Sequence, residues 1–190
     1  MARYVIPEQY CDEDGLCLDS RVVQAASQKI KQSGTAQVVN VETKREKQNP
    51  PLLFALSDLQ SECNRLYGMG AQQVLDIAQS LYETHKATTY PRTDCGYLPE
   101  SQLAEVPAVI KALVAADKNL QKILPHLNLL QQSRAWNDKK ITAHHGIIPT
   151  QGRVDMSKMS EDEFKLYDLI RRRYLAQFLP LCEVDKTVVQ

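Results

Sequence analysis

Three residues with complementary chemistry, Tyr90, Arg92 and Asp94, stand at alternate positions in the segment Thr88–Pro99. Pro91 fixes its own φ and favours an extended conformation for the residue before it. Because an extended backbone sends alternate side chains to one side, we expect a phenol, a guanidinium and a carboxylate on the same face. A phenol can attack phosphorus, a guanidinium can hold phosphate oxygens, and a carboxylate can orient a partner. On spacing alone, the simpler interpretation is a Tyr–Pro turn with a surface salt bridge.

A second segment, Ser133–Thr150, is locally basic. Its cations Arg134, Lys139 and Lys140 accompany one acid, and it contains the only tryptophan of the chain, Trp136. Basic groups beside an aromatic ring are typical of a groove that follows a nucleic-acid backbone and offers a stacking surface. We therefore predict that these four side chains contact DNA.

Histidines and cysteines show no metal-binding pattern in the sequence. The pair His144-His145 has no Cys or carboxylate at ligand spacing, and the five cysteines are scattered without a CxxC motif. We expect a histidine that contacts phosphate or packs, free thiols in a reducing cytosol, and no metal ligands in this sequence.

Helical patterns in the middle of the chain must position these segments. Ser57–Gln60 predicts a capping box, and Gly68 and Gly70 predict the end of that helix. A second helix is expected from about Ala71, where apolar residues recur at helical spacing.

Two further helices are predicted beyond the Tyr90 segment. The first covers about Ser101–Ala116, with a kink or break at Pro107. The second opens with a capping box at Ser160–Glu163 and ends before Pro180. The aromatic and aliphatic residues of this last helix recur on one face, from Phe164 through Tyr167, Ile170 and Tyr174 to Phe178.

Strand-like segments bracket this helical middle. Gln37–Thr43 and Val184–Val189 are rich in β-branched residues, while a modest helix is expected near Arg21–Lys31. The polar run Lys44–Asn49, followed by Pro50-Pro51, is typical of a boundary between domains. This order indicates that the helical part is inserted into a β-rich domain.

Composition limits the classes of protein that remain. The 190 residues contain 23 basic and 23 acidic side chains, with 43% hydrophobic and 24% charged residues. These values suit one globular domain, or one with pieces of a second, and exclude a disordered tail, a collagen-like fibre and a coiled-coil rod. Zero net charge argues against a chromatin-like polycation but leaves a local DNA-binding face open. No apolar run is long enough for a membrane span, and the first residues lack a secretory signal pattern.

Two motifs occur in an order that resembles one enzyme family. Tyr90–Asp94 reads Tyr-Pro-Arg-Thr-Asp, and Ala143–Pro149 reads Ala-His-His-Gly-Ile-Ile-Pro. Together they resemble motifs of type IA DNA topoisomerases, specifically of the topoisomerase III branch. Pro51–Gln60 also resembles the stretch that opens the tyrosine-bearing domain of that family. The similarity covers about residues 37–190, and residues 1–36 match more loosely.

The resemblance implies a role for each matching residue. Tyr90 would be the nucleophile that cuts one DNA strand and keeps its 5′-phosphate as a phosphotyrosine. Arg92 would bind that phosphate and stabilise the transition-state charge. His144 would contact the scissile region, and Glu83 matches a family acid near it. Asp94 would orient His144, which we infer from the alternation of the Tyr90 segment.

The family also implies an architecture. We predict a mainly α fold in which a helical domain is inserted between strands of a β-rich gate domain that is present only in part. Residues 1–45 would carry outgoing strands of the gate domain, residues 46–179 the helical tyrosine-bearing domain, and residues 180–190 a returning strand.

Mg²⁺ would be supplied from outside this sequence. The family holds it in an acidic Toprim-type domain, and no comparable acidic pair occurs here. We therefore expect a fragment of a topoisomerase that breaks one strand, passes another and reseals without ATP. The isolated fragment would be a monomer that does not relax supercoiled DNA. Its expected partners are single-stranded DNA and the remainder of the same enzyme, and it would bind no membrane. It would work in the bacterial cytosol or nucleoid.

Two other function classes stay open at this point. In a non-catalytic helical nucleic-acid-binding module, Arg92, Lys139 and Lys140 would dominate and Tyr90→Phe would be silent. A protein-interaction domain without a nucleic-acid role would show no salt-dependent binding to oligonucleotides.

Overall fold

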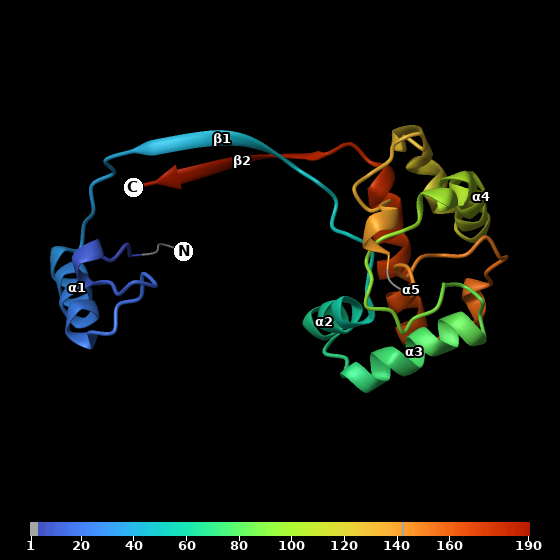
Figure 1. The fold of residues 1–190 in the computed structure, drawn as a ribbon, viewed down its shortest axis with the longest axis horizontal. Helices are drawn as coiled ribbons and strands as arrows, with labels where there is room; N and C mark the ends of the chain where they lie inside the picture. Colours follow the sequence, from blue (N-terminus) through green and yellow to red (C-terminus); the bar gives the residue numbers. More distant parts are fainter. Residues whose placement is uncertain (1–3, 142) are drawn as a thin grey trace. The chain divides into compact units, whose positions relative to one another are not determined.

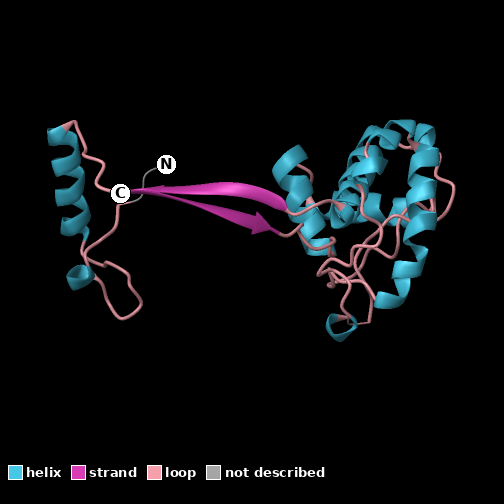
Figure 2. Cartoon of the chain, turned by 90° about the horizontal axis from the view of Figure 1, so that it is seen from above, coloured by secondary structure: helices cyan, strands magenta, loops and turns pink. Residues whose placement is uncertain are grey.

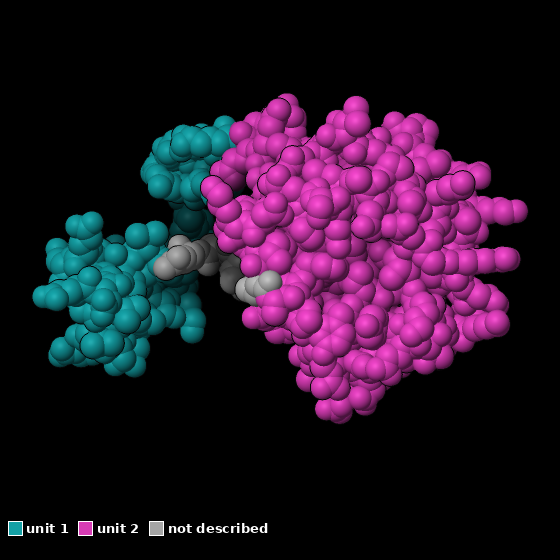
Figure 3. Space-filling model, turned by 45° about the vertical axis from the view of Figure 1, so that its right-hand side comes forward, with its two compact units in different colours: residues 1–44, 185–190 teal, residues 45–184 magenta. Residues whose placement is uncertain are grey.

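A computed structural model describes residues 4–141 and 143–190. The chain forms two compact units, residues 1–44 with 185–190, and residues 45–184 (Figure 3). The larger unit contains both segments that the sequence singles out.

In the smaller unit, the main helix is α1, Ser20–Ser33, preceded by a 3₁₀ turn at Glu8–Tyr10. The carboxylate of Asp19 caps α1 by accepting a hydrogen bond from the backbone N–H of Arg21 at 2.9 Å. Gly34 ends it in the left-handed conformation, with φ of 62°. The helix predicted near Arg21–Lys31 is confirmed.

One two-stranded sheet pairs β1, Val41–Gln48, with β2, Cys182–Val189 (Figure 2). The strands are antiparallel, because Thr43 bonds Thr187 at 2.9 Å while Lys47 pairs with Glu183 at 3.3 Å. The division between the two units falls at residues 44 and 45, at the start of the polar run Lys44–Asn49, while β1 continues through this run to Gln48. Nearly every side chain of the sheet is exposed, so cross-strand polar pairs replace the apolar alternation that sequence patterns detect.

Four α-helices build the larger unit (Figure 1): α2, Leu56–Tyr67; α3, Ala71–Glu83; α4, Val106–Ala116; and α5, Glu161–Leu175. Short 3₁₀ helices lie between and after them, at Glu100–Glu105, Lys118–Lys122, Leu124–His126, Asp138–Lys140, Met156–Lys158 and Ala176–Phe178. With one small sheet besides these helices, the described chain is mixed, and about half of it is helical.

Helix α3 packs against both α2 and α5 and supplies the centre of the core. Leu59 of α2, Val74 and Leu81 of α3, and Leu166 and Ile170 of α5 are fully buried. Burying each such aliphatic side chain contributes roughly 1.5–3 kcal/mol to folding. The helix predicted from Ala71 is confirmed as α3. The preceding helix, α2, ends at Gly68, which is left-handed with φ of 69°.

The capping box predicted at Ser57–Gln60 is wrong. Helix α2 begins at Leu56, whose backbone N–H donates to the carbonyl of Thr93 at 2.9 Å, and its first turn has no side-chain cap. The amide of Gln60 donates instead to the carbonyl of Ala71 at 3.0 Å. The backbone just beyond Tyr90 therefore satisfies the first N–H of α2, one residue before the predicted cap at Ser57.

The second predicted capping box is present at the start of α5. The Ser160 hydroxyl accepts from the N–H of Glu163 at 3.2 Å, and the Glu163 carboxylate accepts from the N–H of Ser160 at 2.8 Å. The predicted aromatic face of α5 is buried at Tyr167 and Tyr174, whereas Phe164 is 39% exposed.

The helix predicted over Ser101–Ala116 is divided. A 3₁₀ helix covers Glu100–Glu105, and α4 then starts at Val106 with Pro107 in its first turn. Proline is compatible with this position because the first N–H groups of a helix have no partner inside it.

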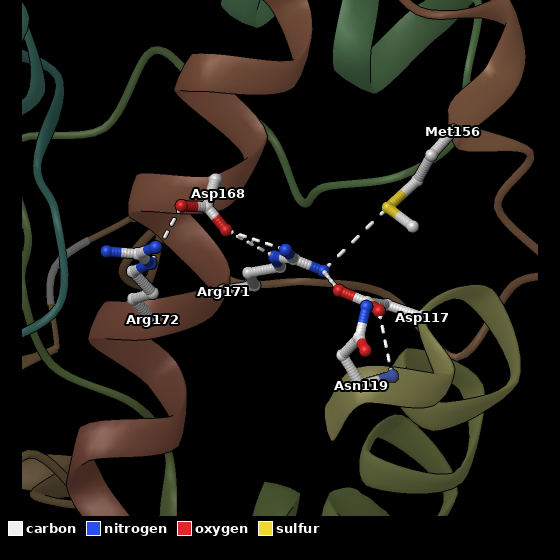
Figure 4. Close-up of polar contacts among 6 residues, drawn as sticks. All are labelled: Asp117, Asn119, Met156, Asp168, Arg171 and Arg172. Carbon is white, nitrogen blue, oxygen red and sulfur yellow. Dashed lines mark hydrogen bonds and ion pairs between the residues drawn. The ribbon is translucent and has the colours of Figure 1, made fainter. Parts of the chain in front are cut away.

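A buried cation ties α5 to the end of α4 (Figure 4). The guanidinium of Arg171, with 8% of its side chain exposed, donates to Asp168 at 2.7 Å and to Asp117 at 2.9 Å. It also contacts the sulfur of Met156 at 3.8 Å. Asp117 is the residue that ends α4, so one side chain fixes three segments of this unit.

Candidate active site around Tyr90

Backbone pairing joins the loop that carries Tyr90 to the loop that carries His144. The N–H of Thr89 donates to the carbonyl of Ile148 at 2.9 Å, and the N–H of Ile148 donates to the Thr89 hydroxyl at 3.0 Å. Thr88 and Pro149 form an antiparallel bridge next to this pair. The two motifs are therefore fixed side by side by hydrogen bonds adjacent to the reactive positions.

Two glycines allow these loops to approach closely. A Cβ on Gly146 would lie 2.9 Å from the Cβ of Leu53, and a Cβ on Gly96 would lie 2.8 Å from the Leu53 carbonyl oxygen. The N–H of Gly146 donates to the carbonyl of Tyr97 at 2.8 Å. These contacts leave no room for a side chain at either glycine, so packing rather than an unusual φ requires them.

The alternation predicted after Tyr90 is visible in the burial of the side chains. Pro91, Thr93 and Cys95 are buried, whereas Arg92 and Asp94 are exposed. The buried Thr93 hydroxyl accepts from the N–H of Cys95 at 3.1 Å. The N–H of Thr93 donates to the carbonyl of Pro91 at 3.0 Å, so the segment turns at Arg92, and it presents both the guanidinium and the carboxylate to solvent.

Tyr90 itself is half-buried between two rings. Its ring lies edge-on to Tyr82, with centroids 5.6 Å apart and planes at 81°, and 4.8 Å from the ring of His144. A cavity of about 140 Å³ opens beside it, lined by Tyr90, Pro99, Ile141, Ala143, His144 and His145. Tyr90 and His144, which the resemblance places in one catalytic set, are brought together here.

His145 also lines this cavity, although no role was predicted for it. Its Nδ1 lies 2.8 Å from the carbonyl oxygen of Gly146, and its Nε2 lies 3.0 Å from the amide nitrogen of Gln102. A neutral ring that donates to the Gly146 carbonyl accepts from Gln102, which satisfies both ring nitrogens. The adjacency to His144 was the only signal in the sequence, and the Gln102 contact was not visible there.

The predicted DNA-binding lysines lie on an exposed turn at Asp138–Lys140. The ammonium of Lys140 donates to the Tyr97 hydroxyl at 3.2 Å and lies 5.0 Å from the centre of that ring. Arg134 is exposed and donates to the Pro50 carbonyl at 3.4 Å.

The predicted stacking role of Trp136 is wrong. Its side chain is only 3% exposed and packs against Phe178, with ring centroids 5.4 Å apart. Hydrogen bonds from Leu98 to Ala135 and from Asn137 to Leu98 hold the tryptophan segment in place. The ring therefore belongs to the core, and its faces are not available to a base.

Glu83 is exposed at the end of α3 and does not line the cavity. Its carboxylate accepts a hydrogen bond from the amide of Gln79. The structure thus places Glu83 on the helix that precedes the Tyr90 loop, outside the contacts of the phenol ring.

The described side chains around Tyr90 do not fit a Mg²⁺ ion. Within residues 4–141 and 143–190, no three His, Cys, Asp or Glu side chains gather closely enough to hold a metal ion. Mg²⁺ requires several oxygen ligands in near-octahedral order, which the phenol, guanidinium and imidazoles around Tyr90 do not supply.

The five cysteines are free thiols, as the sequence predicts. In the part of the chain that the structure describes, no helix has both the length and the apolarity to cross a membrane.

Comparisons with known proteins agree on one family. The family model described as DNA topoisomerase matches residues 5–190. DNA topoisomerase 3 of Pasteurella multocida is 42% identical over 182 residues, which are 96% of this chain and 28% of that protein. DNA topoisomerase 3 of Salmonella typhimurium is 43% identical over 183 residues, again 96% of this chain and 28% of that protein. The chain spans just over a quarter of the length of these relatives.

A solved structure shares the fold. Topoisomerase I from Thermotoga maritima matches 94% of this chain and 28% of its own, with a TM-score of 0.56 and 21% sequence identity. The chain therefore belongs to the type IA DNA topoisomerase family, within which its similarity is to the topoisomerase III branch.

Proposed function

We propose that this chain is the tyrosine-bearing part of a DNA topoisomerase III that cuts and reseals one DNA strand. The observation that supports it most directly is the half-buried Tyr90, which lies against His144 beside a small cavity and opens the motif Tyr-Pro-Arg-Thr-Asp. The backbone pairing of the two loops gives this arrangement a fixed geometry.

In the proposed reaction, the hydroxyl oxygen of Tyr90 attacks the phosphorus of a DNA phosphodiester. A bond between that oxygen and the 5′-phosphate forms while the bond from phosphorus to the 3′-oxygen breaks. The phenol loses its proton, and the departing 3′-oxygen gains one. One phosphodiester is exchanged for another, so the 3′-hydroxyl can reverse the step and reseal the strand without ATP.

The exposed Arg92 would bind the phosphate oxygens in a bidentate manner and stabilise the charge of the transition state. His144 would contact the scissile phosphate from the opposite loop, and Asp94 would orient His144. Lys139 and Lys140 would hold the neighbouring strand electrostatically from the turn at Asp138–Lys140.

Arg134 and Glu83 complete the proposed DNA-contacting set. Arg134 would add a phosphate contact from the start of the His144 loop, and Glu83 would lie near the cut because it precedes the Tyr90 loop. We assign residues 46–179 to the tyrosine-bearing domain, and residues 1–45 and 180–190 to parts of a gate domain.

The remainder of the enzyme would supply Mg²⁺, whose role when bound is to neutralise charge on the DNA at the cut. A phenol is a weak nucleophile without an activating group, and a Toprim-type domain would complete its surroundings. We expect the isolated chain to bind single-stranded DNA weakly, as a monomer, without relaxing supercoiled DNA. In a bacterium it would act on DNA in the cytosol or nucleoid.

A chimera tests this proposal. The matching segment of DNA topoisomerase 3 from Pasteurella multocida is replaced by this chain, and the product is incubated with single-stranded DNA labelled on the 3′ side of the cut. We expect a labelled covalent protein–DNA adduct on a denaturing gel, and its complete loss in Tyr90→Phe with DNA binding retained.

Tyr97→Phe is the matched control, because it removes a nearby half-buried phenol hydroxyl, which accepts from Lys140, and keeps the ring that the Lys140 ammonium contacts. It should leave the adduct intact. If Tyr90→Phe kept the adduct, or if Arg92, Lys139 and Lys140 variants alone changed behaviour, the non-catalytic binding module would replace the enzyme.

A further inference from the structure

A large groove lies on the face of α4, separate from the Tyr90 cavity. Its volume is about 1140 Å³, and its lining shares no residue with that cavity. One wall is α4, and the other is the segment Gln151–Lys158.

Small side chains form the helical wall. Ala108, Ala112, Ala115 and Ala116 face the groove, whereas the opposite side of α4 is buried in the core through residues such as Leu113. Methyl groups leave space for an extended chain to approach the helix closely. The alanines of this wall therefore determine the width of the groove and add no charge to it.

Positive charge lines both walls. Lys111 on α4 and Arg153 on the facing segment form no ion pair among the described residues. Lys158 pairs with Asp155 at 3.6 Å, but both side chains are more than half exposed, so this pair is weak. Three cations and one carboxylate therefore line the groove, which favours a polyanion.

The facing wall is held in place from beneath. Val154 is buried, and Met156 contacts the guanidinium of Arg171 at 3.8 Å (Figure 4). The same guanidinium binds Asp117 at the end of α4 at 2.9 Å. One buried cation thus joins the bases of both walls, so the spacing of the two walls is set before a ligand arrives.

We propose that this groove binds the phosphate backbone of single-stranded DNA at a distance from the cut. The inference rests on the proposed function, because it assigns a second contact for the strand that Tyr90 would cleave. Charge on both walls favours DNA over an apolar protein segment, and the alanine wall offers no base-specific group, so binding should be independent of sequence.

Fluorescence anisotropy of a labelled oligothymidine tests the inference on the 190-residue chain. The double variant Lys111→Glu/Arg153→Glu should weaken binding about tenfold at low salt and reduce the slope of log K against log salt by about 1–2. The matched control is Lys118→Glu/Lys122→Glu, which changes the net charge equally on exposed residues that do not line the groove. This control should retain at least a third of the wild-type affinity.

A third variant, Lys139→Glu/Lys140→Glu, separates the two sites. If it abolishes binding while the groove variant matches the control, DNA lies only beside Tyr90 and the inference is overturned, whereas the proposed function stands. Loss of the Tyr90-dependent adduct in the chimera would overturn the proposed function instead.

Thermal melting guards against misfolding of the groove variant. If Lys111→Glu/Arg153→Glu melts below wild type, Lys111→Gln/Arg153→Gln should still weaken binding, by about half the logarithmic change. Unchanged DNA binding by a folded groove variant would point to another domain as the occupant and would refute the inference.

Discussion

The ring of Tyr90 lies 4.8 Å from the ring of His144, although the two side chains come from different loops. Hydrogen bonds between Thr89 and Ile148 hold the loops together next to this contact. The backbone therefore sets the relative position of the two rings. Each loop should keep its place when the ring on either loop is replaced.

Removal of the His144 ring should impair chemistry more than binding. In the chimera, His144→Ala should reduce the rate of adduct formation about 10²-fold, a size typical for the loss of one preorganised group that stabilises developing charge. His126→Ala, on an exposed 3₁₀ turn, is the control. Quench-flow with a labelled oligonucleotide measures the rate, and an equal loss in both variants would contradict a role for His144.

A methyl group at Gly146 should separate the two loops. Its Cβ would lie 2.9 Å from that of Leu53, and overpacking of this kind costs roughly 1–3 kcal/mol. We expect Gly146→Ala to lower the free energy of unfolding by this amount and to reduce adduct formation. Gly152→Ala, where the nearest atom is 3.4 Å away, should be nearly silent in urea titrations.

Acid should destabilise the α3–α5 contact through Glu163. The Ser80 hydroxyl, which donates to this carboxylate at 2.6 Å, is the largest cause that lowers the pKa of Glu163 to about 2; burial opposes it, and Ser160 and His85 assist. The usual value is 4.5, so the stability from this group is complete above that pH and is lost as the pH falls towards 2.

Melting temperatures between pH 6 and pH 2 should therefore fall less steeply in Glu163→Gln than in the wild type. Glu161→Gln is the matched control, since Glu161 is 84% exposed at the same end of α5. Parallel curves for Glu163→Gln and the wild type would contradict this assignment.

Loss of Arg171 should destabilise the larger unit strongly. Arg171→Leu leaves the carboxylates of Asp117 and Asp168 without their buried cation, and breaking a buried pair costs about 3–5 kcal/mol. Arg172→Leu removes a cation that is 75% exposed and bound only to Asp168, so it should cost less than about 1 kcal/mol. Urea unfolding followed by tryptophan fluorescence of the buried Trp136 measures both.

Local signals were sufficient for the helices whose ends depend on nearby residues. The capping box at Ser160 and the left-handed Gly68 are interactions within a few residues, and both were predicted correctly. The start of α2 could not be predicted, because its cap is the carbonyl of Thr93 from a distant segment. The wrong assignment of Ser57 follows from that long-range contact.

The candidate site shows the same division. The alternation of exposed and buried side chains after Tyr90 depends on neighbouring residues, and the sequence predicts it. The order of the two motifs, which resembles that of the family, predicts that His144 belongs to the same site as Tyr90. Composition suggested that Trp136 was a stacking surface, but its burial depends on Phe178, which the basic character of its own segment does not indicate. The groove beside α4 requires two segments to meet, and neither wall alone predicts it.

The antiparallel pairing of Asn40 with Gln190 has a mechanical consequence. The N–H of Asn40 donates to the carbonyl of Gln190 at 3.1 Å, and the N–H of Gln190 donates back at 2.9 Å. A pulling force applied across these two residues would load the hydrogen bonds of β1 and β2 one after another rather than together. The two-stranded sheet would therefore separate under a low tension and pair again when the tension is removed. The helical residues that lie between β1 and β2 in the sequence would remain unstretched.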